Sequence, residues 1–200
     1  MSRATVPLFP LRTVLYPGGP LPLRIFEARY LDMISRCMKE DAPFGVLLLA
    51  DGPEVGGVAM ARTYTIGTLA RISDWYQGTD GLLGITAMGT QRFCLHAVEQ
   101  QDDGLNLGEV EILESGERVS VPEEYIGWSS LLRAVLDDLG KLYEGVERDY
   151  DDASWLSYRF AEILPLEMDE RQVCLEMQDP LERLNYLRPM LRQVREGQTQ

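Results

Sequence analysis

Short apolar runs alternate with turn-forming residues through the first 118 positions of the chain, a pattern typical of a β-rich domain. The pattern predicts strands at Val6–Leu8, Leu21–Ile25, Phe44–Leu49, Gly57–Ile72, Leu82–Met88, Arg92–Glu99 and Leu105–Leu113. In the sixth run, Phe93, Leu95 and Ala97 fall on one face, because side chains alternate along a strand. Asp80-Gly81 and Asp103-Gly104 lie between runs, where glycine allows a hairpin to turn.

One helix is predicted within this β-rich part, from Glu27 to about Lys39. Its apolar residues recur at i, i+3 and i+4, the spacing that places one stripe against a core. They are Tyr30, Leu31, Ile34, Cys37 and Met38.

The rest of the chain is predicted to be helical. The S-x-x-E pattern from Ser120 to Glu123 indicates a helix start, because the hydroxyl and the carboxylate can bond to free backbone N–H groups. The apolar stripe of this helix is Trp128, Leu132, Val135, Leu139 and Leu142.

Three further helices are expected after it. One runs from about Asp152 to Leu164 and stops before a proline, and a short one begins near Asp169. Asp179-Pro180 is a good start for the last helix, where Pro189 is expected to cause a kink or an early end. The stripe of the last helix is Leu181, Leu184, Leu187, Leu191 and Val194.

Composition places a domain boundary near residues 115–122. Residues 1–118 hold 14 of the 18 glycines and 7 of the 11 prolines, so turns concentrate there. The periodicity changes at the same point. The sequence therefore predicts an α+β protein with two domains, residues 1–118 and 119–200.

Charge and hydropathy narrow the classes of function. Apolar residues make up 45% and charged residues 26% of the chain, as in soluble globular proteins. The 32 acidic residues outnumber the 19 Lys and Arg and give a net charge of −13, which disfavours nucleic acid as a partner. Apolar stretches fall far short of the ~20 residues that span a bilayer, and no signal-like segment opens the chain. We expect a cytoplasmic protein without membrane contact.

Few residues offer catalytic or metal-binding chemistry. His96 is the single histidine, which excludes most catalytic triads and multi-histidine zinc sites. Cys37, Cys94 and Cys174 form no C-x-x-C pair, so free buried thiols are expected and neither a metal nor a cofactor is. Cys94 and His96 would lie side by side on a strand without aiming at each other. The acidic run from Glu144 to Asp152 lacks the calcium-loop pattern, which favours a solvated loop.

The opening of the chain carries the most specific pattern. Its segments are Pro7-Leu8-Phe9-Pro10-Leu11, Val14-Leu15-Tyr16-Pro17-Gly18 and Leu21-Pro22-Leu23-Arg24-Ile25-Phe26-Glu27-Ala28-Arg29-Tyr30. In order, spacing and residue type they resemble the start of the Lon protease N-terminal substrate-recognition domain family. Later segments resemble later blocks of that family, namely Phe44-Gly45-Val46, Gly67-Thr68-Leu69-Ala70-Arg71-Ile72, Asp80-Gly81 and Gly89-Thr90-Gln91-Arg92-Phe93. Leu164-Pro165-Leu166 and Glu182-Arg183-Leu184 are similar to its helical continuation.

The resemblance implies a PUA-like β-barrel with one inserted helix, followed by an α-helical bundle, and a role in recognising unfolded or extended polypeptide. Full Lon proteases also carry an ATPase and a Ser–Lys peptidase module, whose motifs this chain lacks, so neither activity is carried over. We expect a free-standing, non-catalytic module that holds an extended segment by backbone pairing and pocket filling. A separate protease or chaperone is a candidate partner. Two alternatives stay open, a small hydrolase that uses Cys94 or acidic loop residues, and an RNA-binding PUA-like protein.

Trp75 and Tyr76 are candidates for contact with a polypeptide. They lie in Ser73–Gly81, a polar, glycine-bearing stretch that predicts a hairpin loop. Exposed aromatic side chains supply rigid contact area at a low cost in entropy. The competing interpretation is that Trp75 folds back and packs on the protein.

Further candidates lie in the opening segment, where prolines hold the chain extended and Gly18-Gly19 allows a sharp turn, so that the segment forms a rigid corner. Tyr16 and Phe26 are predicted at its opposite ends. Arg24 and Arg29 are its basic members, and an ion pair of Glu27 with either of them would join strand to helix. The competing interpretation is that these residues only stabilise the fold and do not contact a partner.

Overall fold

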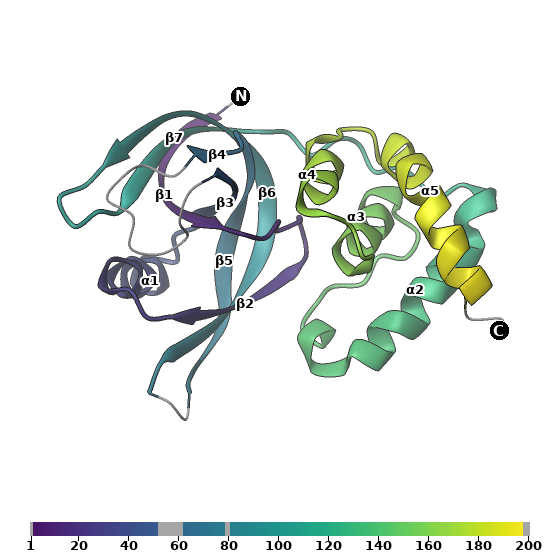
Figure 1. Cartoon of the computed structure of the whole chain (residues 1–200), viewed down its shortest axis with the longest axis horizontal. Coiled ribbons are helices and arrows are strands. Elements are labelled where there is room, and N and C mark those ends of the chain that lie inside the picture. Colours follow the sequence, from purple (N-terminus) through teal and green to yellow (C-terminus); the bar gives the residue numbers. More distant parts are fainter. Residues whose placement is uncertain (1, 52–61, 79–80, 198–200) are drawn as a thin grey trace. The chain divides into compact units, whose positions relative to one another are not determined.

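A computed structural model of the chain describes residues 2–51, 62–78 and 81–197. The chain divides into two compact units, Met1–Ser115 and Gly116–Gln200. The first contains a mixed sheet with one long helix, and the second is helical (Figure 1). Among the described helices, none has both the length and the hydropathy needed to cross a membrane.

The sheet of the first unit is built from seven strands in the described residues. They are β1 (Ser2–Leu11), β2 (Pro20–Ile25), β3 (Phe44–Asp51), β4 (Arg62–Thr63), β5 (Ile66–Gln77), β6 (Leu83–Gln100) and β7 (Asn106–Ile112). Their hydrogen-bonded order is β1-β7-β6-β5-β3-β4, and β2 pairs with β6. β1 also pairs with β3 in parallel, so the sheet returns to its first strand. The helix α1 (Ala28–Glu40) lies between β2 and β3 in the chain.

Strand ends differ from the prediction where the sheet contains bulges. Leu82–Met88 and Arg92–Glu99 were predicted as two strands, but β6 runs through both, because a register shift against β5 bends the strand without ending it. A second shift, against β7, falls between Leu95 and Ala97. It exchanges the faces, so Ala97 is exposed and Val98 packs against the core, contrary to the predicted alternation. Residues 57–61 of the predicted run Gly57–Ile72 lie outside the described residues.

The helix α1 closes one of the two apolar clusters of this unit. Its buried residues are Tyr30, Met33, Ile34 and Cys37. Leu31 and Met38, which the spacing placed inside, are exposed at the edges of this stripe. The predicted helix is confirmed. Its buried face is rotated slightly from the predicted one, so that Met33 is buried in place of Leu31 and Met38.

The proline-rich corner before β2 is fixed by backbone contacts with Gly89 of β6. Gly18 N–H donates to the Gly89 carbonyl at 2.8 Å, and Gly89 N–H donates to the Gly19 carbonyl at 2.9 Å. A Cβ at Gly89 would lie 2.2 Å from the Tyr16 carbonyl oxygen. Gly18 has a φ of 69°, which glycine adopts without strain. The corner therefore depends on the absence of side chains at two glycines.

The second unit consists of helices and short 3₁₀ turns. They are η1 (Glu123–Tyr125), α2 (Ile126–Leu139), η2 (Gly140–Tyr143), α3 (Ala153–Ile163), α4 (Met168–Glu176) and α5 (Pro180–Gly197). The predicted capping by Ser120 is wrong, because Ser120 forms a β-bridge with Asp152 and α2 begins at Ile126 without a side-chain cap. Leu139 and Leu142 are exposed, since α2 ends at Leu139 and the chain changes direction at Gly140, whose φ is 58°.

The later helix starts are confirmed. The Asp152 carboxylate accepts a hydrogen bond from Ser154 N–H at 2.9 Å, and the Asp179 carboxylate accepts one from Leu181 N–H at 2.8 Å. α5 continues through Pro189, so this proline does not end the helix. The predicted stripe residue Val194 lies outside the described side chains.

Arg183, which is fully buried, joins three segments of the helical unit. Its guanidinium donates to the carbonyls of Cys174 at 2.8 Å and Met177 at 2.5 Å, and to the Ser157 hydroxyl at 2.8 Å. It also lies over the Tyr158 ring at 3.7 Å. The carbonyls at the end of α4 thereby receive donors that the helix itself cannot provide.

We expect Gly89→Ala to lower the free energy of unfolding by about 2 kcal/mol or more, because its methyl group would collide with the Tyr16 carbonyl. Urea denaturation measures the change. Gly116→Ala is the matched control, since a Cβ at Gly116 has no heavy atom within 4 Å among the described residues. Equal stability of the two variants would show that the corner is not tightly held.

Arg183→Met should lower the free energy of unfolding by roughly 3 kcal/mol, because it removes the guanidinium donor from the buried Cys174 carbonyl and from the partly buried Met177 carbonyl. Chemical denaturation again provides the measurement. Arg183→Lys should recover part of the loss, since an ammonium group reaches fewer of the three acceptors than a guanidinium. A stable Met variant would mean that water or other side chains replace the lost donors.

Candidate functional site

An apolar groove of about 240 Å³ opens beside β2 in the first unit. Its lining residues come from the end of β1, from β2 and from the start of α1, and they are Phe9, Leu11, Leu23, Arg24, Ile25, Phe26, Glu27 and Tyr30. We call it the β2–α1 groove. It brings two predicted contact residues, Arg24 and Phe26, into one place.

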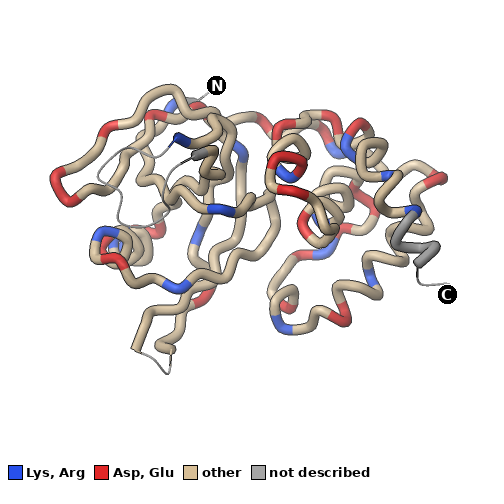
Figure 2. The backbone as a smooth tube through the Cα atoms, in the orientation of Figure 1, with Lys and Arg blue, Asp and Glu red and all other residues tan. Residues whose placement is uncertain are grey.

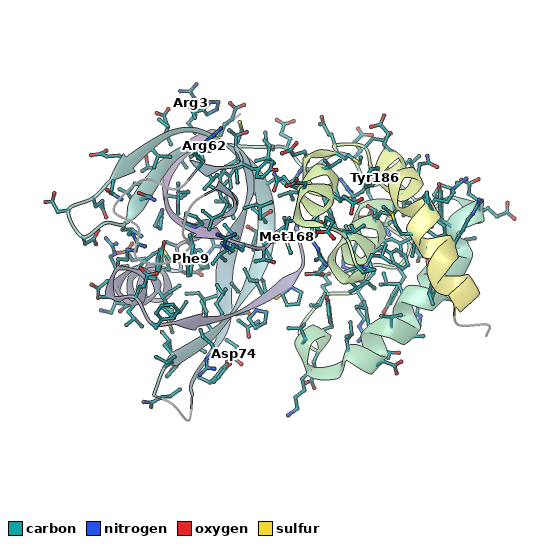
Figure 3. All side chains as sticks on the ribbon, in the orientation of Figure 1. Arg3, Phe9, Arg62, Asp74, Met168 and Tyr186 are labelled. Atoms are coloured by element: carbon teal, nitrogen blue, oxygen red, sulfur yellow. The ribbon has the colours of Figure 1, made fainter. Side chains whose placement is uncertain are left out.

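Buried aromatic rings line the inner part of the β2–α1 groove. Phe9, labelled in Figure 3, stacks on Tyr30 with ring centroids 4.1 Å apart and an interplanar angle of 22°. Phe9 also contacts Phe44, with centroids 6.2 Å apart. Phe9, Tyr30 and Ile25 are buried, so the inner lining is fixed by the core of the unit.

Exposed side chains form the rim of the groove. Phe26 follows the last residue of β2 and is 55% exposed. Arg24 is also exposed. The rim therefore offers an apolar ring and a cation beside the lining described above.

Arg29 fixes the start of α1 behind the groove. Its guanidinium forms an ion pair with the Glu27 carboxylate at 2.8 Å and donates to the Gly104 carbonyl at 2.9 Å. It also lies over the Tyr30 ring at 4.7 Å. The predicted pair Glu27–Arg29 is confirmed, and the Glu27 carboxylate forms no hydrogen bond that caps α1. Arg29 is mostly buried, and its contacts hold the start of α1 in place beside the groove.

A row across three strands connects the groove with the hairpin of β5 and β6. Arg24 on β2 is paired with Gly84 on β6, and Gly84 is paired with Tyr76 on β5. The Tyr76 ring lies over Gly84, since a Cβ there would be 2.3 Å from Tyr76 Cζ. Tyr76 is 51% exposed. Residues that are paired in a sheet share a face, so Arg24 and Tyr76 lie on the same side of it.

Trp75 and Tyr76 were predicted in a loop, and this prediction is wrong. Both belong to β5, which forms a hairpin with β6 (Figure 1), and they pair with residues of β6 that pair on their other side with β2. Neighbouring residues of a strand point to opposite faces, so the two rings do not form one surface. Trp75 is paired with the buried Ile85 and is nevertheless 58% exposed, because it lies near the end of the strand.

Tyr16 differs from the other candidates because it is fully buried. The corner that Gly89 holds turns its side chain inward, so no surface remains for contact with a partner. The structure therefore supports the competing interpretation for Tyr16, a structural role in packing.

Sequence reasoning missed most of the groove. Phe9, Leu11, Leu23, Ile25 and Tyr30 were interpreted as parts of a motif or a core, and Gly84 was not singled out. No local signal marks them, because the groove exists only where β1, β2 and α1 meet. The alternation of Leu21, Leu23 and Ile25 in β2 could have shown which face they share.

The geometry offers binding surfaces and little reactive chemistry. Burial raises the pKa of the Cys37 thiol and raises that of Cys174 to about 11, so neither is an activated nucleophile. His96 lies 2.9 Å from a Glu111 carboxylate oxygen, and Cys94 is half-buried. In the described ranges, no cluster of three or more His, Cys, Asp or Glu side chains could hold a metal ion.

Two acidic residues of the run Glu144–Asp152 have structural roles. The Asp149 carboxylate binds the Arg118 guanidinium at 2.8 Å, and this hydrogen bond lowers the pKa of Asp149. Asp152 caps α3. Both carboxylates therefore have partners within the protein, and no bound ligand is needed to explain them.

Comparison with known proteins agrees with this fold. The family model of the ATP-dependent protease La (LON) substrate-binding domain matches residues 5–193. A Lon N-terminal domain protein from Xanthomonas campestris has a similar crystal structure, with a TM-score of 0.75, 34% sequence identity, and coverage of 92% of this chain and 96% of that one. The N-terminal domain of a Mycobacterium avium complex Lon protease shares the fold at 18% identity and a TM-score of 0.62, covering 94% of this chain and 97% of that one.

Whole Lon proteases are much longer than this chain. Lon protease 2 of Myxococcus xanthus is 26% identical over 197 residues, which are 96% of this chain and 24% of that protein. The chain spans about a quarter of the length of the curated relatives it matches. The matching family model describes the substrate-binding domain and neither the ATPase nor the peptidase module. Because this model covers nearly the whole sequence, the chain belongs to the family of LON substrate-binding domains.

Proposed function

We propose that this protein is a non-catalytic module that recognises unfolded or extended polypeptide through the β2–α1 groove. The observation that supports it most strongly is the groove itself, with a buried aromatic lining and the exposed Phe26 at its rim. Membership of a substrate-binding domain family supports the same function.

The size of the groove suits one large apolar side chain. A protein cavity of roughly 150 Å³ lined by apolar residues can take up benzene. The β2–α1 groove, at about 240 Å³, is larger and open to solvent. An unfolded chain exposes the apolar side chains that a folded protein buries, so the groove distinguishes the two states.

The free edge of β2 is poorly suited to backbone pairing with a client. Among the described strands, β2 pairs with β6 alone. Pro20 and Pro22 have no N–H group, so an added strand would find few donors along this edge. We therefore propose recognition by pocket filling, and we do not retain backbone pairing at β2.

Arg24 and Tyr76 extend the proposed contact surface beyond the groove. The row Arg24–Gly84–Tyr76 places a guanidinium and an exposed ring on one face of the sheet. Tyrosine and arginine often supply much of the binding energy of an interface. The net charge of −13 favours clients that carry basic residues.

We further propose a finer description of the fold and its context. The return of the sheet from β3 to β1 supports a PUA-like barrel, and the second unit would be its helical bundle. The module would work in the cytoplasm, in protein quality control, and a separate protease or chaperone would act on what it binds.

Titration of a small disulfide-bonded protein, in its native form and in its reduced and alkylated form, tests the function. We expect saturable binding of the unfolded form alone, measured by fluorescence anisotropy of a labelled client. Phe26→Ala and Tyr76→Ala should each weaken binding by about five- to thirtyfold, as is typical of interface aromatic residues.

Met38→Ala is the matched control, because Met38 is an exposed apolar residue of α1 that does not line the groove. Its affinity should stay within about twofold of that of the unchanged protein, as expected for a residue outside the contact. Binding of neither client form, or equal binding of both, would contradict the proposal. Loss of affinity in the Met38 variant alone would move the site to another face of α1.

A further inference from the structure

A second hollow, of about 470 Å³, lies within the helical unit. Its lining residues are Ser120, Val121, Ile126, Ser129, Ser130, Arg133, Tyr150 and Asp151. They come from α2 and from the two segments that are joined by the β-bridge of Ser120 and Asp152. We call it the α2 hollow. None of its lining residues belongs to the β2–α1 groove.

Arg133 is held in the α2 hollow by an aromatic ring. Its guanidinium carbon lies 4.2 Å from the centroid of the Tyr150 ring. Tyr150 is buried and packs edge-on against Trp155, with centroids 5.0 Å apart. A guanidinium that stacks on a fixed ring keeps its N–H groups directed outward along its edge.

Arg133 has no acidic partner in the described part of the chain. This distinguishes it from Arg118, Arg148 and Arg188, which form ion pairs with Asp149, Asp137 and Glu124. Acidic residues outnumber basic ones in this unit (Figure 2), and none of them forms an ion pair with Arg133 among the described residues. Its N–H groups are available to an external acceptor.

Hydroxyl groups lie around this cation. Ser129 donates to the Tyr150 carbonyl at 3.0 Å, which ties α2 to the segment that holds Tyr150. Ser120 and Ser130 are exposed, and neither hydroxyl has a hydrogen-bond partner among the described residues. Val121 and the exposed Ile126 add an apolar wall to the lining.

We propose that the α2 hollow binds a small organic anion, a carboxylate or phosphate that carries an apolar group. The Arg133 fork can form two parallel hydrogen bonds to such an oxyanion, and the free hydroxyls can add more. The apolar group would lie against Val121 and Ile126.

The charge of the unit makes the site selective. Its acidic surface, and the Asp151 carboxylate in the lining, repel anions at longer range. Affinity must therefore come from short-range hydrogen bonds and apolar contact, so simple inorganic anions should bind weakly.

Titration with benzoate and phenyl phosphate, followed by ¹H–¹⁵N NMR, tests the proposal on the whole chain. We expect saturable shifts in the backbone amides of Ser129 to Arg133, and none with the neutral analogue benzyl alcohol. The tighter of the two anions identifies the preferred oxyanion. Arg133→Gln should weaken binding about tenfold or more, because it removes a charge-assisted bidentate contact.

Two further variants complete the test. Asp151→Asn should strengthen binding about two- to fivefold by removing the repulsive charge. Arg192→Gln is the matched control, since it removes an exposed arginine of α5 that does not line the hollow, and its affinity should not change. NMR spectra of each free variant establish that it is folded.

The proposal is overturned if neither anion binds, if benzyl alcohol binds equally well, or if folded Arg133→Gln keeps the affinity of the unchanged protein. These outcomes do not depend on client binding by the first unit. Failure of either proposal can therefore be distinguished from failure of the other.

Discussion

The close approach of the Tyr16 carbonyl to Gly89 determines where β2 begins, and the candidate site depends on this contact. Two hydrogen bonds between Gly89 and the Gly18-Gly19 pair fix the corner. β2 then pairs with β6 from Pro20 onward, so Arg24 lies opposite Gly84. A slip by one residue would move Leu23 and Ile25 out of the core and turn Arg24 inward. One glycine on β6 thus sets the positions of the groove lining and of its rim.

Local chemistry made some elements predictable. The starts of α3 and α5 depend on a carboxylate that bonds to an N–H group two residues later, a contact that needs no distant partner. The turn at Asp103-Gly104 is similar, since Gly104 has a φ of 82° and Asp103 accepts from Leu105 N–H. Such features are contained in a few consecutive residues.

Other features depended on the partner strand or on distant segments. The bulges in β6 arise from its register with β5 and β7, which no periodicity within β6 reveals. Trp75 and Tyr76 are surrounded by polar residues and so resemble a loop, yet their backbones pair with Ile85 and Gly84. The groove requires Phe9, Ile25 and Tyr30 to meet across three elements. Exposure of the two aromatic residues was predicted, and their opposite faces were not.

The prolines of β2 have a consequence for the proposed recognition of unfolded chains. Aggregation-prone segments grow by adding to unpaired strand edges, and each new strand offers its own edge to the next. Pro20 and Pro22 interrupt the donors on such an edge beside the groove. Under the proposed function, a client would be held by a side chain without its backbone starting a growing stack, and it would leave in the state in which it arrived.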